Sequence, residues 1–238
     1  MNALFYLIKG FKLLTQKGLR RYLIIPLFVN ILLFSLFIGF GLHWISALTK
    51  LLPHWLYFLK WLFDLLFILA SSVIIVYVFT LAANLIGAPF NNLLSEKVEL
   101  IMTGHKPTEG ETFHDVIKDM PRVLKRQWDK IRYYIPRAIL LLLLYLVPGV
   151  NLIAGFLWLL FSAYMMAMQY IDYPLDNHKT TFAQMKEHLK THLFPSLAFG
   201  FSVLICSMIP IVNFAVMPAA VCGATLMYLD QKQKQNLN

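Results

Sequence analysis

The sequence predicts an all-α integral membrane protein, and three observations support that fold class. Of its 238 residues, 59% are hydrophobic and only 14% are charged, whereas soluble domains usually carry about 25% charged residues. Residues 22–42 and 65–90 contain no charged side chain, and about 20 apolar residues are enough to span a bilayer. The basic residues flank apolar segments, as the positive-inside rule describes for membrane proteins.

An N-terminal amphipathic helix is predicted for residues 1–17. Bulky apolar residues share one side of this helix: Leu4, Phe5, Leu7, Ile8, Phe11 and Leu14. Lysines occupy the other side, so we expect the helix to lie in the membrane interface. Two long transmembrane helices are predicted to follow, over residues 22–48 and 55–90.

Residues 91–135 form a polar segment that mixes basic and acidic side chains. This composition predicts a water-exposed helical segment on the cytoplasmic side. The N-terminal segment is basic as well, so an even number of crossings must separate the two. Two transmembrane helices meet that requirement, and we expect residues 1–238 to form a single membrane domain.

A short repeat occurs in the C-terminal part of the chain. Pro-Gly-Val-Asn at residues 148–151 and Pro-Ile-Val-Asn at 210–213 each lie between two apolar stretches. The stretches before them, residues 137–147 and 196–209, would rise only about 17 and 21 Å as helices, less than the roughly 30 Å hydrocarbon core. Proline ends a helix and asparagine can cap the next one.

These lengths predict two helical hairpins that only partly penetrate the membrane, over residues 136–170 and 194–229. A polar linker at residues 171–193 and a polar tail at 230–238 complete the chain. Backbone at such a hairpin tip must be surrounded by protein or by a water-filled cavity. The alternative is four to six full crossings, which needs unusually thin spans and places one basic linker outside.

The stretch Gly18-Leu19-Arg20-Arg21 is the first candidate binding site. Glycine allows a turn in which consecutive N–H groups point at one spot, and the following helix presents its positive end. Two guanidinium groups would add charge-assisted hydrogen bonds to a tetrahedral oxyanion. The alternative interpretation is that both arginines are ordinary positive-inside residues at a helix start.

The sequence resembles the CysZ family of bacterial sulfate permeases over nearly the whole chain. Five stretches in the family's order carry the resemblance: Gly18-Leu19-Arg20, residues 84–91 with 95–99, the tip at Pro148, residues 172–178, and the tip at Pro210. The resemblance implies two long transmembrane helices, two partly penetrating hairpins, a homo-oligomer and residence in a bacterial inner membrane.

The resemblance also implies a function and a site. The function is import of sulfate for cysteine biosynthesis, with sulfite or related oxyanions as further ligands and membrane lipid as the surroundings. The family's sulfate-binding motif corresponds here to Gly18, Leu19 and Arg20, with Arg21 adjacent.

Polar residues near or within apolar segments are further candidates for an anion pathway: Asn30, Asn91, Glu96, Asn151 and Asn213. The amides can donate N–H groups to a passing oxyanion, although each can instead cap a helix or bond to a neighbouring helix. Glu96 repels an anion directly, so we expect it to pair with an arginine.

Other functions find little support in the sequence. No Walker-type glycine loop or nucleophile elbow is present, so neither an enzyme nor a cofactor is predicted. The basic residues lack a nucleic-acid motif. His188 and His192 have no evident third metal ligand. Asp172, Asp176 and His178 resemble a loose metal or phosphotransfer cluster, but Pro174 and Asn177 indicate a turn in this segment. A membrane scaffold without transport activity remains the alternative function.

Overall fold

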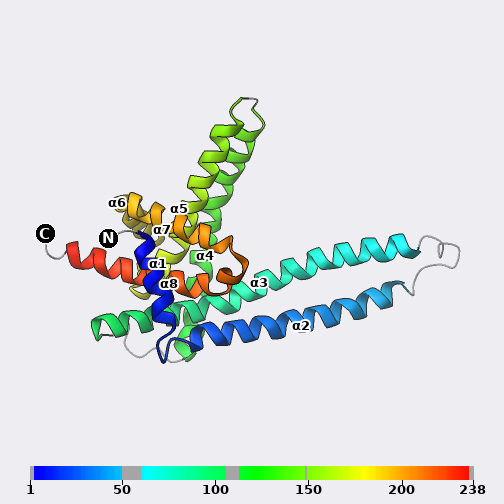
Figure 1. The fold of residues 1–238 in the computed structure, drawn as a ribbon, viewed down its shortest axis with the longest axis horizontal. Helices are drawn as coiled ribbons and strands as arrows, with labels where there is room; N and C mark the ends of the chain where they lie inside the picture. The colour runs from blue at the N-terminus through cyan, green and yellow to red at the C-terminus, as the bar shows by residue number, and fades with distance from the viewer. Residues whose placement is uncertain (1–2, 50–59, 106–112, 148, 236–238) are drawn as a thin grey trace. The chain divides into compact units, whose positions relative to one another are not determined.

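The computed structural model describes residues 3–49, 60–105, 113–147 and 149–235, and in these ranges all regular structure is α-helical (Figure 1). The helices are α1 (Ala3–Leu14), α2 (Arg21–Thr49), α3 (Lys60–Thr103), α4 (Phe113–Tyr145), α5 (Asn151–Asn177), α6 (Phe182–Thr191), α7 (Leu193–Ser207) and α8 (Pro210–Gln235). The predicted all-α class is therefore confirmed for the described residues.

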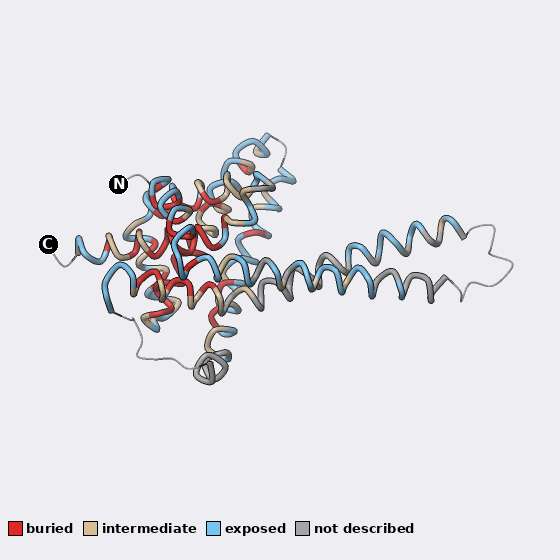
Figure 2. Tube along the Cα trace, turned by 60° about the horizontal axis from the view of Figure 1, so that its bottom comes forward, coloured by how far each residue is buried: buried red, intermediate tan, exposed pale blue. Residues whose placement is uncertain are grey.

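The chain divides into two compact units, one of residues 1–22 with 91–238 and the other of residues 23–90. In the second unit, α2 and the first part of α3 lie alongside each other (Figures 1 and 2). Its described surface is rich in exposed apolar side chains such as Phe28, Phe40 and Val73. Such a surface suits lipid rather than water.

The first unit, residues 1–22 with 91–238, contains the buried core (Figure 2). Within it α1 packs against α7 and α8, and α5 packs against α4, α6, α7 and α8. The largest fully buried side chains include Leu7, Leu19, Met168, Phe199 and Met227. These residues come from both ends of the chain, so the core forms only when distant segments meet.

Helix α1 divides its apolar residues between two faces. Leu7 and Leu14 are buried in the core, whereas Leu4, Phe5 and Ile8 are exposed. The hydroxyl of Tyr6 donates to Asp230 of α8 at 2.9 Å. Burial, and then this hydrogen bond, raise the pKa of Tyr6 to about 12, so the phenol stays protonated and donates at neutral pH. A helix is therefore present within the predicted segment, but its apolar residues do not share one side, and its location in the membrane interface stays a prediction.

Glycines allow two helix pairs in this core to approach closely. A Cβ atom on Gly10 of α1 would collide with the carbonyl oxygen of Ala219 in α8. A Cβ atom on Gly200 of α7 would collide with the carbonyl oxygen of Ala163 in α5. Small residues at such crossings bring helix backbones into direct contact, which is a common packing device in membrane proteins.

Both predicted helix breaks are present at the repeat. Helix α4 ends at Tyr145 and α5 begins at Asn151, while α7 ends at Ser207 and α8 begins at Pro210. By length and composition, Asn151–Asn177 and Val212–Lys234 could each cross a membrane, and α6 with α7, bent by 98°, could form a third span. The described residues thus provide two or three candidate spans.

Two helices continue through residues at which the sequence analysis predicted one segment to end and the next to begin. Helix α3 continues through residues 90 and 91, and α4 continues through residues 135 and 136 despite Pro136. The division into compact units falls at residue 91, where the polar segment was predicted to begin. The predicted segments therefore differ from the helices in their ends, and their positions relative to the membrane stay predictions.

Thr181 begins α6 with a capping box, which gives a first testable prediction. Its hydroxyl accepts from the N–H of Gln184 at 3.3 Å, and the N–H of Thr181 donates to Gln184 Oε1 at 2.8 Å. Thr181→Ala removes the first of these bonds and should destabilise the start of α6 by about 1 kcal/mol. Hydrogen exchange of the first α6 amides should accelerate several-fold in this variant. Thr191→Ala, which removes a hydroxyl bonded to the Glu187 carbonyl, should leave those amides unchanged, and equal rates in both variants would contradict the assignment.

Candidate functional site

Gly18 and Leu19 form a turn that joins α1 to α2. Gly18 has a φ of +98°, a conformation that residues with a Cβ atom rarely adopt. No atom would obstruct a Cβ here, so the backbone conformation, and not space, requires glycine. The Leu19 side chain is fully buried in the core. Leu19 therefore anchors the turn, and only its backbone is available for a ligand.

Arg20 and Arg21 are both exposed beside this turn. Arg20 Nε donates to the carbonyl oxygen of Thr15 at 2.7 Å. Arg21 Nη2 donates to the hydroxyl of Tyr22 at 3.2 Å, and its guanidinium lies 5.0 Å from the Tyr22 ring centre. Each of these hydrogen bonds orients a guanidinium and uses one of its five N–H donors. Other N–H donors of each arginine can therefore bind a ligand.

The backbone of the turn adds possible donors. The N–H of Leu19 donates to the carbonyl oxygen of Gln16 at 3.2 Å, and the N–H of Tyr22 donates to the carbonyl oxygen of Leu19 at 3.0 Å. Within the described residues, no backbone acceptor is found for the N–H groups of Gly18 and Arg20. The structure therefore brings all four predicted binding residues into one turn at the start of α2, where anions are favoured.

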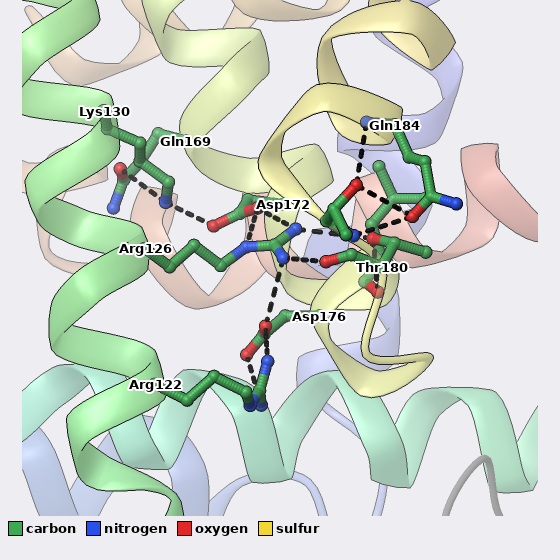
Figure 3. A network of polar contacts seen from close by, with 10 residues as sticks. Arg122, Arg126, Lys130, Gln169, Asp172, Asp176, Thr180 and Gln184 are labelled. Atoms are coloured by element: carbon green, nitrogen blue, oxygen red, sulfur yellow. Dashed lines mark hydrogen bonds and ion pairs between the residues drawn. The ribbon is translucent and has the colours of Figure 1, made fainter.

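A buried ion-pair network links α4 to α5 (Figure 3). Arg122 pairs with Asp176 at 2.5 Å, Arg126 pairs with Asp172 at 2.6 Å, and Lys130 pairs with Asp172 at 2.5 Å. The three basic residues are spaced four apart on α4, and so are the two carboxylates on α5, so each set lies on one helix face.

Arg126 is the central residue of this network. It also contacts Asp176 at 3.4 Å and donates to the carbonyl oxygen of Thr180. Only 7% of its side chain is exposed, against 35% for Arg122. Three cations face two carboxylates, and buried charges of this kind are stable only while they remain paired.

The sequence-based interpretation of this segment was wrong. Asp172, Pro174 and Asp176 lie inside α5, which continues to Asn177, and the turn follows at residues 178–179. Burial of the end of α5 and the ion pairs with α4 offset the backbone hydrogen bond that Pro174 removes. The matching i, i+4 spacing of the two charged sets was a usable signal for the network.

The predicted pathway residues lie in different environments. Asn91 is buried and its Nδ2 donates to the hydroxyl of Tyr173 at 3.3 Å. Glu96 is half-buried, whereas Asn151 and Asn213 are exposed near the two hairpin tips. The Oδ1 of Asn151 accepts from the N–H of Leu152 at 3.0 Å, which is a local bond at the start of α5. The side chain of Asn30 lies outside the described part.

A second polar cluster, which sequence analysis did not find, joins α3, α5 and α8. The hydroxyls of Ser95 and Thr225 lie 2.9 Å apart, and the amide of Asn177 lies 3.0 Å from Ser95 Oγ. All three residues are buried. They fix the end of α3 against the core by mutual hydrogen bonds, as buried polar groups require.

Metal binding finds no support among the described residues, because no three His, Cys, Asp or Glu side chains converge there. The rings of His188 and His192 lie 4.9 Å apart, and His188 Nε2 lies 2.9 Å from Gln231 Oε1. This pair therefore packs against α8 with a protein partner.

Taken together, the apolar helices and the candidate spans are those of an α-helical membrane protein, and the basic turn at the start of α2 is its candidate anion site. Residues 6–218 match the family model described as "EI24: Sulfate transporter CysZ/Etoposide-induced protein 2.4", and the chain belongs to this family. It is 43% identical over 236 residues to the protein named "Sulfate transporter CysZ" of Pseudomonas paraeruginosa strain PA7, and equally to those of Pseudomonas aeruginosa strains LESB58 and PAO1. Each alignment covers 98% of this chain and 96% of the relative.

Proposed function

We propose that this protein is a sulfate permease that imports sulfate across a bacterial inner membrane for cysteine biosynthesis. The observation that carries the proposal is the 43% identity to proteins named sulfate transporter, over 98% of the chain. The chemistry of the turn at residues 18–21 supports the proposal independently, because it suits a tetrahedral dianion.

Sulfate binds at this turn through two kinds of donor. Arg20 and Arg21 supply charge-assisted hydrogen bonds, which are stronger than bonds between neutral groups. The backbone N–H groups of Gly18 and Arg20 are further hydrogen-bond donors. The N-terminus of α2 adds the positive end of the helix dipole, which attracts an anion. Leu19 holds the turn in place from the core, so its contribution is to position the backbone.

The proposed arrangement in the membrane follows the sequence-based expectation. The helices of residues 22–48 and 55–90 cross the membrane, and the hairpins of residues 136–170 and 194–229 enter it only in part. Several copies of the chain assemble into a homo-oligomer, and lipid surrounds the apolar helices. The alternative of full crossings by Asn151–Asn177 and Val212–Lys234 is compatible with their length and composition.

The anion pathway is proposed to use amide donors along the chain. Asn91, whose Nδ2 donates to the Tyr173 hydroxyl at 3.3 Å, is the first candidate. Asn151 and Asn213 at the hairpin tips and Asn30 in the first transmembrane helix are the other amides. Glu96 has a different proposed role, which is to pair with an arginine. Sulfite and related oxyanions share the geometry or charge of sulfate, so we expect them to compete for the arginines.

Sulfate uptake by proteoliposomes tests the proposal. Uptake of radiolabelled sulfate should be saturable with wild-type protein and should fall more than tenfold in Arg20→Ala plus Arg21→Ala, because each lost charged hydrogen bond is worth about 1.5–3 kcal/mol. The matched control is Lys12→Ala plus Lys17→Ala, which removes the same charge from exposed positions nearby and should retain most uptake.

Two outcomes would contradict parts of this proposal. Wild-type uptake no faster than that of empty vesicles, over several gradients and pH values, would leave the non-transporting scaffold as the better function. Equal loss in the arginine and lysine variants would mean that general positive charge, and not a site at residues 18–21, supports uptake.

A further inference from the structure

A cluster of aromatic and basic side chains joins α4 to α6, within the unit of residues 1–22 with 91–238. The ring of Tyr133 on α4 lies 6.2 Å from the ring of Phe182 on α6, edge to face. The guanidinium of Arg137 lies 3.6 Å from the centre of the Tyr133 ring, and the ammonium of Lys186 lies 5.9 Å from the same centre. We call these four residues the basic–aromatic cluster. Two cations from different helices thus share one aromatic ring.

Neither cation of the cluster has an acidic partner. Among the described residues, no carboxylate lies within ion-pair distance of Arg137 or Lys186. Nη1 of Arg137 donates to the carbonyl oxygen of Tyr133 at 2.8 Å, which uses one of its five N–H donors, and Lys186 brings three N–H donors of its own. Arg137 is exposed and Lys186 is partly exposed, so both can donate to a ligand from outside the chain.

The surroundings of the cluster stay positively charged when all its neighbours are counted. The ionisable residues within one turn of the cluster on α4 and α6, apart from its own members, are Asp129, Lys130, Arg132, Glu187, His188 and Lys190. Lys130 and His188 have polar partners of their own. Arg132, Lys190 and the two cations of the cluster outnumber the two carboxylates. Helix α5 packs against both helices and carries no charge over residues 151–171, so the cluster attracts an anion.

The residues beside the cluster are typical of a membrane interface. Beyond Arg137, α4 exposes Leu140 and Leu143, in the segment that is proposed to enter the membrane. The ring of Tyr134 stacks on Phe161 of α5 at 5.4 Å, and aromatic side chains of this kind gather at the level of the lipid headgroups. A ligand that matches both the cations and the apolar surface carries an anionic group and an acyl chain.

From the two cations on one ring, the excess of positive charge and the adjoining apolar surface, we propose that the basic–aromatic cluster binds the phosphate of an anionic phospholipid. Arg137 and Lys186 donate to the phosphate oxygens, and the Tyr133 ring orients both cations. The acyl chains lie along the apolar residues that follow on α4. A zwitterionic lipid also carries a phosphate, but these cations repel its ammonium group. The turn at residues 18–21 takes no part in this site.

Calorimetric titration of the full-length protein in an uncharged detergent tests this site, with dihexanoyl phosphatidylglycerol as the probe. Saturable binding is expected with wild-type protein, and the affinity should fall about tenfold or more in Arg137→Gln plus Lys186→Gln, which removes both charged donors. Dihexanoyl phosphatidylcholine should bind wild-type protein about tenfold more weakly. Lys125→Gln plus Lys234→Gln removes the same charge from exposed positions outside the cluster and should leave the affinity unchanged.

Lys186→Gln alone is a second variant if the double variant does not fold, and it should bind the probe several-fold more weakly than wild type. The proposal is overturned if wild-type protein shows no saturable binding or if phosphatidylcholine binds as tightly as phosphatidylglycerol. It is also overturned if the folded cluster variants bind as wild type does, or if the control pair of lysines loses as much affinity as the cluster pair.

Competition with inorganic phosphate and with sulfate distinguishes a lipid site from a site for a soluble anion. Neither ion has an acyl chain to place on the apolar surface. Each should therefore displace dihexanoyl phosphatidylglycerol only at concentrations about tenfold or more above that of the lipid. Displacement at equal concentrations would overturn the lipid assignment and would indicate a soluble anion as the ligand.

Discussion

Arg126→Met should destabilise the protein by about 3–5 kcal/mol, which is the usual cost of removing one partner from a buried ion pair. The substitution keeps most of the apolar stem but leaves Asp172 and Asp176 with fewer cations, and it also removes the donor to the Thr180 carbonyl. Unfolding in mixed micelles, followed by far-UV circular dichroism, measures the change. Arg122→Met is the matched comparison, because that side chain is 35% exposed and should cost much less.

The effects of removing Arg126 and of neutralising its partner Asp172 should not simply add. In Arg126→Met with Asp172→Asn, a neutral amide replaces the buried carboxylate. The double variant should therefore lose less unfolding free energy than the sum of the losses in the two single variants. If Arg126→Met unfolds at the same denaturant concentration as wild type, the network contributes no net stability. If Arg122→Met costs as much as Arg126→Met, burial is not what determines the cost.

Gly200→Leu is expected to have the second large effect. At Gly200 any Cβ atom would collide with the Ala163 carbonyl oxygen and would lie 2.8 Å from the backbone nitrogen of Ala167. These are backbone atoms, so the helices α5 and α7 must move apart. Overpacking usually destabilises a protein by about 1–3 kcal/mol. Because this variant separates α5 from α7, we expect its destabilisation to be about 3 kcal/mol or more. The yield of monodisperse protein and its thermal midpoint should both fall.

Gly39→Leu on α2 is the control for this substitution, because no atom of the described residues lies within 4 Å of a Cβ at that position. It adds the same side chain to a helix, so effects on helix propensity are shared by both variants. Equal thermal midpoints for the two would show that α5 and α7 tolerate separation, and that the close approach at Gly200 does not stabilise the core.

Much of the fold could be predicted because it depends on local properties of the chain. The helix breaks at residues 146–150 and 208–209 follow from the proline repeat, and the turn at Gly18 follows from the conformational freedom of glycine. The proximity of Gly18, Leu19, Arg20 and Arg21 could be predicted because the four residues are consecutive, while their role in sulfate binding stays a proposal. Burial of the Leu19 side chain could not be predicted, because it depends on the tertiary core.

Other features could not be predicted because they depend on which helices meet. The basic residues of α4 and the carboxylates of α5 are each regularly spaced. The local sequence does not determine, however, that these two helix faces pack against each other. The proline at residue 174 suggested a turn, and the segment is helical because pairing with Arg126 and burial outweigh the local preference. The close approaches at Gly10 and Gly200 likewise become visible only in the packed helices.

The contact between α1 and α8 has a consequence for how the chain is made. Tyr6 and Asp230 are 224 positions apart, and a ribosome completes α1 long before α8. The buried face of α1, with Leu7 and Gly10, therefore lacks its partners until α7 and α8 have been synthesised. A nascent chain must hold α1 elsewhere in the meantime, and the headgroup layer can accept its apolar side chains. Assembly of this core is consequently a late step, completed by the docking of one end of the chain against the other.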